Sequence, residues 1–421
     1  MKRRAPFVAL ALALACAGVA CQVVAGISRV EQVDPPPDSA PEAAREAAPP
    51  PDPCAHVTPP SIPDTDDDPN NAVDDFYIAL RRVTLVAPTG GTLGYDLDGV
   101  CTCDKRPYAA HDGGESCQAS QKFCDGDGGV DNEIATFATD FGALIDIDKA
   151  ANINDRIQSG VQTTLIVISK YNGKANDREV AFGIFTSEGI PDTQAAPGCP
   201  DAGHAGSYLS PGWCGKDKWT VSTASVLQSG SKFTPKAVGT GYVNNYRFVV
   251  RFTGQAGVPF AGYRLALGSP VSSGLLVPLD VNLQPLDTAA GPPPKDQVAF
   301  WRLDEGIIAG RVPVSELLAA IGTVAAPGGD GGGPKNPHLC ATATFPIIKG
   351  EICNRQDINA TLNLDFAAGA SCDALSTAIG LIGGPARVEG FVTAPIDQND
   401  CYPTEDGGGP IGVPGVTYRC P

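Results

Sequence analysis

An acidic, cysteine-rich stretch between residues 94 and 132 holds the side chains with the clearest chemical potential. It reads GYDLDGVCTCDKRPYAAHDGGESCQASQKFCDGDGGVDN, with carboxylates and cysteines separated by glycines. Carboxylate oxygens on a glycine-rich loop are the ligands that calcium prefers, because Gly lets the chain fold around the ion. Cysteine sulfurs could instead bind zinc or pair as disulfides. The stretch is therefore a metal site, a redox centre or a disulfide-closed loop.

The carboxylate spacing favours a calcium site. The predicted ligands come from DLDG and DGDGGVDNE, namely Asp96, Asp98, Asp125, Asp127, Asp131, Asn132 and Glu133. The second segment resembles the Asp-rich loops of thrombospondin type 3 repeats over about eight residues. It is not an EF-hand, since Gly129 and Thr136 stand where two ligands would be needed. The alternative is a solvated acidic turn followed by a helix, whose first turn favours Asp and Glu.

The cysteine count predicts disulfides. Fourteen cysteines less Cys16 and Cys21 leave an even number in the folded part, which in an exported chain indicates six bonds. These cysteines are Cys54, Cys101, Cys103, Cys117, Cys124, Cys199, Cys214, Cys340, Cys353, Cys372, Cys401 and Cys420. Short loops favour Cys199 with Cys214 and Cys401 with Cys420, and the four cysteines between 101 and 124 are expected to pair among themselves.

Zinc and redox chemistry are the rivals for those four cysteines. His111 could add a zinc ligand, but Cys101 and Cys103 are separated by one residue, which is too tight for the usual zinc knuckle. An oxidising compartment would also consume free thiols. A redox pair at Cys101 and Cys103 has no thioredoxin-like unit nearby to support it.

Recognisable catalytic motifs are missing from the sequence. It contains no Gly-x-Ser-x-Gly, P-loop, dinucleotide fingerprint or His-Glu-x-x-His, so neither a nucleotide nor an organic cofactor is expected. A binding or structural protein is favoured over an enzyme, with a glycan or another surface protein as partner. The aromatics Trp213, Trp219, Trp301, Tyr95 and Tyr108 could stack on sugars or fill the core. A glycan-active hydrolase using two carboxylates is the alternative, because sequence cannot place such a pair.

The first 20 residues predict export. They combine a basic start with an apolar run and small residues, which is typical of a signal peptide. Cys21 follows at once, and the arrangement resembles a bacterial lipoprotein precursor in which this cysteine is lipidated. Gln22 after it implies the outer membrane or cell surface. Without Lys2 and the two following arginines the net charge of −17 becomes −20, which disfavours nucleic-acid binding.

The remaining chain divides into a linker and a body. Residues 21–73 are rich in Pro and Asp and predict an extended, lipid-anchored linker, whereas residues 74–421 predict a mainly β body with a possible boundary near 288–297. Short apolar runs between turn residues predict a disulfide-stapled antiparallel β-sandwich, jelly-roll-like, with a few short helices at 130–145, 313–322 and 371–384. The body loosely resembles uncharacterised Cys-rich bacterial surface lipoproteins, which implies no particular ligand.

Overall fold

The computed structural model describes most of the chain from Cys54 onward. The described residues are 54–85, 92–103, 114–141, 153–191, 203–205, 208–229, 232–253, 255–260, 263–326, 338–393, 399–404 and 406–421. The signal segment, Cys21, Tyr108 and His111 lie outside them. Residues 51–421 form one compact unit, and the body is mainly β, as predicted.

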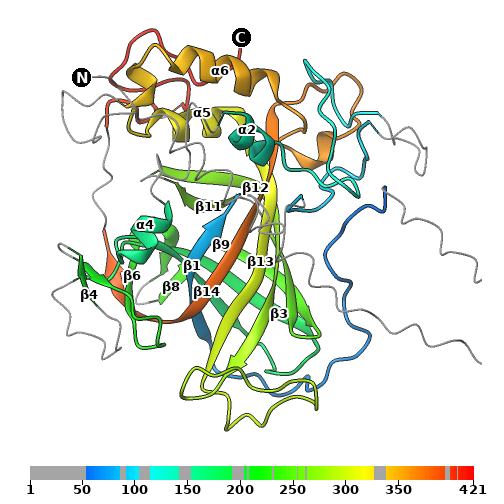
Figure 1. Cartoon of the computed structure of the whole chain (residues 1–421), viewed down its shortest axis with the longest axis vertical. Helices are drawn as coiled ribbons and strands as arrows, with labels where there is room; N and C mark the ends of the chain where they lie inside the picture. The colour runs from blue at the N-terminus through cyan, green and yellow to red at the C-terminus, as the bar shows by residue number, and fades with distance from the viewer. Residues whose placement is uncertain are drawn as a thin grey trace, which may run out of the picture. The chain divides into compact units, whose positions relative to one another are not determined.

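Eight of the described strands close into an antiparallel barrel (Figure 1). They are β1 (Phe76–Thr84), β2 (Thr163–Ser169), β3 (Asp177–Ser187), β9 (Ala237–Asn244), β10 (Arg247–Phe252), β12 (Tyr263–Leu279), β13 (Phe300–Pro313) and β14 (Ala374–Val392). β1 pairs with β2 and then β3, β9, β10, β12, β13 and β14 follow in turn, until β14 pairs back onto β1. The predicted sandwich is therefore corrected to a closed barrel.

The physical reason for this correction is that a sandwich and a barrel share the same local signals. Both consist of short alternating runs bounded by turns. Closure of the barrel depends on long strands that bend, and β12, β13 and β14 are such strands. Their pairing shifts register at Gly268/Val271, Ser273/Leu275 and Leu303/Gly306. Such bulges increase the local twist of a strand, which allows the sheet to curl onto itself.

The barrel interior is packed with apolar side chains. Alternate residues point inward, for example Ile78 and Leu80 of β1 and Phe248 and Val250 of β10. The cavity left among them measures about 20 Å³, which is room for roughly one water molecule. The interior is thus a core rather than a ligand chamber.

The segment at 371–384 is a strand and not the predicted helix. It forms the first part of β14, which is buried at nearly every position up to Pro385. Ile379 and Leu381 pack in the barrel interior, whereas Ala378 on the outer face packs against Tyr95. Because both faces are covered, the alternation that marks a strand disappears from the sequence.

The helices that the structure describes are short. They are α2 (Glu133–Phe141), α4 (Ile153–Gln158), α5 (Val314–Gly322) and α6 (Phe345–Asn354). α5 confirms the helix expected at 313–322, and α2 confirms the described part of the one expected at 130–145. α2, α5 and α6 lie together beyond one end of the barrel (Figure 1). None of these helices is long and apolar enough to span a bilayer.

Smaller strands surround the barrel. They are β6 (Lys218–Ser222), β11 (Gln255–Phe260), the pair β4 (Gly203–Ala205) and β5 (Tyr208–Ser210), and the pair β7 (Val226–Ser229) and β8 (Lys232–Pro235). β6 lies outside the ring and pairs in parallel with the last part of β14. Trp219 of β6 is fully buried there, against Ala79 and Leu165.

The described part of the predicted linker, and the possible domain boundary, are both held by the body. Residues 54–73 lie along it through backbone hydrogen bonds, including Val57 N to Gly128 O (2.8 Å) and Val73 N to Tyr171 O (2.7 Å). The break at 288–297 is a loop between β12 and β13, which pair with each other on either side of it.

Five disulfides join described cysteines, and most join parts of the chain that are far apart. They are Cys54–Cys101, Cys103–Cys124, Cys117–Cys372, Cys340–Cys401 and Cys353–Cys420. The expected Cys401–Cys420 pair is wrong, and only Cys103–Cys124 joins two members of the 101–124 group. Cys214 is also disulfide-bonded, and its expected partner Cys199 lies outside the described residues.

Candidate metal centre

The segment that begins at Cys54 and the glycine-rich turn at 126–130 form the floor of the candidate site. The Cys54–Cys101 disulfide holds the N-terminal segment beside the turn at 126–130, which closes through a hydrogen bond from Gly126 N to Val130 O (3.0 Å). Gly129 has φ +74°, and a Cβ there would lie 2.9 Å from Cys101 Sγ and 3.2 Å from Asp96 Oδ2. Only glycine combines that backbone conformation with so close an approach.

Three predicted ligands converge on this floor. Carboxylate oxygens of Asp96, Asp98 and Asp131 all lie within 4.8 Å of one another. The segment at 95–97 brings them together, because Asp131 N donates to Tyr95 O (3.0 Å) and Leu97 N donates to Asp131 Oδ2 (2.6 Å). The structure thus places the DLDG segment beside the loop at 125–133.

Backbone donors hold the first two of these carboxylates in place. Asp96 accepts from Gly99 N (2.6 Å) and contacts His56 Nδ1 (2.5 Å), and Asp98 accepts from Val100 N (2.9 Å). Each carboxylate retains oxygen lone pairs beyond these bonds. Such fixed oxygens could coordinate a hard cation with little rearrangement.

Three carboxyls at the site resist ionisation. Burial first, and neighbouring carboxylates as well, raise the pKa of Asp98 to about 6 and that of Asp125 to about 8. The pKa of Asp131, which is 3% exposed, is raised well above its usual value by burial and then by Asp98 and Asp125. Among the described residues, no positive charge lowers the pKa of these three carboxyls, and a bound divalent cation would do so.

Ser116 lies beside the Asp98 carboxyl. Its side chain is 2% exposed, and a hydrogen bond from its hydroxyl lowers the pKa of Asp98. Together with the bond from Val100 N (2.9 Å), this contact holds the Asp98 carboxylate in place.

Two of the other predicted ligands differ in position. Asp125 lies beside the cluster, where its Oδ2 accepts from Thr102 N (2.6 Å). Asp127 is exposed at the tip of the turn. We therefore place Asp125 at the edge of the site and Asp127 outside it.

The last two predicted ligands have structural partners instead. The Asn132 amide donates to Leu93 O (2.8 Å), and its oxygen accepts from Ala378 N (3.1 Å). Glu133 pairs with Arg355 at 2.6 Å. Burial raises the Glu133 pKa to about 7 although Arg355 lowers it, so desolvation outweighs the ion pair.

Asp357 belongs to the site but was missed in the sequence. It lies more than 220 residues after Asp131, accepts from Ser376 N (2.9 Å) and is half-buried, and its pKa is raised by burial to about 7. Its negative charge raises the pKa of both Asp125 and Asp131. The sequence around it shows no acidic clustering, so only the fold could reveal it.

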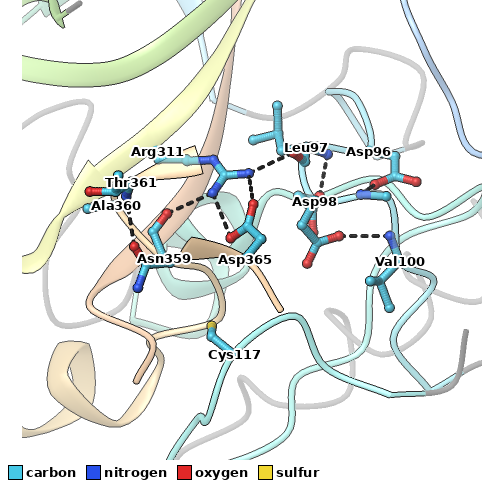
Figure 2. A network of polar contacts seen from close by, with 12 residues as sticks. Asp96, Leu97, Asp98, Val100, Cys117, Arg311, Asn359, Ala360, Thr361 and Asp365 are labelled. Carbon is cyan, nitrogen blue, oxygen red and sulfur yellow. Dashed lines mark hydrogen bonds and ion pairs between the residues drawn. The ribbon is translucent and has the colours of Figure 1, made fainter. Parts of the chain in front are cut away.

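A buried ion pair fixes the wall of the site (Figure 2). Arg311 of β13, 2% exposed, binds both carboxylate oxygens of Asp365 at 2.9 and 2.6 Å. The same guanidinium donates to Leu97 O (2.7 Å), in the residue between two predicted ligands, and to Asn359 O (2.8 Å). The charge of Arg311 is thus neutralised by Asp365.

The cysteines of the segment are not metal ligands in this structure. Cys54, His56 and Cys101 lie close together, but Cys54 and Cys101 are bonded to each other. Cys103 and Cys117 are also in disulfides, to different partners. Zinc would need these sulfurs as free thiolates, and a redox pair would need Cys101 and Cys103 bonded to each other, so the disulfides support neither alternative.

Most of the aromatic residues that could stack on sugars are core residues. Trp219 is fully buried, Trp301 is 6% exposed and Tyr95 is 5% exposed. Trp213 is half-buried, with the Arg81 guanidinium 5.9 Å from its ring. The core-filling interpretation therefore holds for Trp219, Trp301 and Tyr95.

Comparisons with known proteins leave the geometry as the guide to function. No protein-family model, curated protein or solved structure matches the chain. The site is a partly buried, disulfide-bounded cluster of carboxylate oxygens, which suits a hard divalent cation.

Proposed function

We propose that the chain is an exported, lipid-anchored surface protein whose barrel domain is stabilised by calcium and serves binding or structural roles rather than catalysis. The observation that carries the calcium assignment is the convergence of the Asp96, Asp98 and Asp131 carboxylate oxygens within 4.8 Å of one another. The lipid anchor rests on the signal-like start and Cys21.

Burial argues for a structural ion rather than a catalytic pair. Asp131 is enclosed by protein, whereas the acid of a glycoside hydrolase must reach the oxygen of a bound sugar in a cleft. The Cys54–Cys101 disulfide and the Arg311–Asp365 pair also hold the cluster rigid, as a structural ion site requires. Calcium accepts irregular oxygen sets that magnesium does not, which favours calcium.

The test is thermal unfolding of the purified mature protein with calcium or with a chelator. Calcium at about 100 times its Kd should stabilise the fold by about 2.7 kcal/mol, and chelator should remove that gain. Asp98→Asn with Asp131→Asn should abolish the calcium response at nearly constant side-chain volume. Asp127→Asn is the matched control and should leave the response intact, because Asp127 is exposed outside the cluster.

An identical melting midpoint with calcium and with chelator would overturn the calcium assignment. Loss of the response in Asp127→Asn but not in the double variant would place the ion elsewhere. Magnesium and zinc at equal concentration serve as comparisons, and a larger shift with zinc would contradict the oxygen-ligand assignment.

A further inference from the structure

A groove opens where β13 and β14 separate. Their pairing begins at Leu303 with Gly383, so the first residues of β13 have no partner on β14. Beyond that point β14 continues beside β1 as far as Ala386, and then turns to pair with β6 from Arg387 onward. The groove between these diverging strands has a volume of about 800 Å³, within the range of roughly 300–1,000 Å³ of small-ligand pockets.

Aromatic side chains line this groove and are held in fixed positions. Phe76 stacks on Trp301 with ring centroids 5.6 Å apart, and Tyr171 packs its edge against Trp301 at 5.2 Å. Phe300 covers the backbone of Gly215, where a Cβ would lie 2.6 Å from its ring. Phe76 and Phe300 are each only partly buried, and both belong to the lining of the groove.

The lining of the groove contains as many acidic as basic side chains. Asp74 and Asp75 lie on one part of the lining and Lys295 and Arg387 on another, and all four are exposed. The groove is therefore locally neutral on a chain of net charge −17. Such a mixture of donors and acceptors can hydrogen-bond hydroxyl groups, but it offers no excess positive charge for a phosphate or sulfate.

We propose that this groove binds a neutral oligosaccharide, with Phe76 and Phe300 packing on sugar C–H faces and Asp75 and Arg387 bonding hydroxyls. Aromatic rings with a few convergent polar groups are the usual lining of a site for a ligand that is apolar on its faces and polar at its edges. The proposal goes beyond the proposed function and is independent of it, since the lining contains no residue of the carboxylate cluster.

The test is isothermal titration of the mature protein with chitohexaose and cellohexaose, with a heparin hexasaccharide as the anionic comparison. At least one neutral probe should bind with a Kd at or below about 1 mM, and heparin should bind more weakly. Phe300→Ala should weaken binding about tenfold, because an aromatic contact contributes up to about 1.5 kcal/mol. Arg387→Ala, at an exposed position, should weaken binding without affecting the fold.

Matched controls are Phe391→Ala and Arg82→Ala, since both residues are exposed and lie outside the groove. Each should bind like the unmodified protein, and circular dichroism should show native structure for all four variants. Binding of neither neutral probe, tighter binding of heparin, or equal losses in the groove and control variants would each overturn the proposal. Repeating the titration with chelator separates it from the calcium site, whose failure would leave sugar binding intact.

Discussion

Arg311 and Asp365 form a two-pronged ion pair inside the protein, in which Nη1 donates to Oδ1 and Nη2 donates to Oδ2 (Figure 2). The pair joins β13 to the segment before β14, and Arg311 also binds the backbone at Leu97. It therefore connects the barrel to the loop that carries the candidate metal ligands.

Breaking this pair should be costly. Arg311→Met would leave the Asp365 carboxylate buried without a partner, which destabilises a fold by about 3–5 kcal/mol. Chemical denaturation of Arg311→Met and of the control Arg302→Met measures the difference. Arg302 pairs with Asp304 on the half-exposed face of β13, and its loss should cost no more than about 1 kcal/mol. An equal loss of unfolding free energy in the two variants would show that the buried pair contributes no more stability than the half-exposed one.

Stability without a cation should fall as pH rises. The folded-state pKa values of Asp98, Asp357 and Asp125 are raised from 3.8 to about 6, 7 and 8. The folded chain therefore holds more protons than the unfolded chain between about pH 4 and pH 8. Stability from these groups is fully present below about pH 4 and is lost by about pH 8. Melting midpoints in chelator across this range measure the slope, and Asp98→Asn with Asp131→Asn should reduce it.

Calcium should stabilise the protein more at pH 8 than at pH 5. Protons compete for the same carboxylate oxygens, so at pH 5 the ion must displace them before it can bind. The calcium-induced shift in melting midpoint at the two pH values measures this competition. A larger shift at pH 5 would contradict binding at the carboxylate cluster.

The disulfide between Cys117 and Cys372 should contribute more stability than that between Cys103 and Cys124. The first joins residues 255 apart and the second joins residues 21 apart. Loop-closure entropy predicts roughly 5 kcal/mol for the longer loop and roughly 3 kcal/mol for the shorter, with the other cross-links narrowing the gap. Denaturation of the two paired Cys→Ala variants tests the order, and a reversed order would show that local strain dominates.

Lipidation should depend on Cys21 alone. In a Gram-negative host the mature protein should incorporate labelled palmitate and enter the detergent phase, and Cys21→Ser should do neither. Cys16→Ser is the control and should label normally, because Cys16 lies inside the apolar run of the signal segment. Labelled Cys21→Ser protein would show that this assignment is wrong.

Local patterns in the sequence were enough to predict part of this structure. Turn residues around short apolar runs indicate a β body, and Pro313 with Gly322 brackets the helix α5. The glycines between Asp125 and Asp131 predict a tight turn, and Gly128 and Gly129 do adopt positive φ. These features depend on neighbours in the chain, where steric and hydrogen-bonding preferences act directly.

The tertiary structure decided what depends on distant parts of the chain. Closure of the barrel requires β1 to pair with β14, about 300 residues later, and no local signal specifies such a pairing. The same closure covers both faces of β14. Its sequence is therefore apolar without alternation, which is why it was predicted as a helix. It also brings Asp357 to the carboxylate cluster and Cys372 to Cys117. The sequence thus shows which side chains carry carboxylates, but the packing of distant strands decides which carboxylates meet. Their burial and the repulsion between their charges exist only in the folded state.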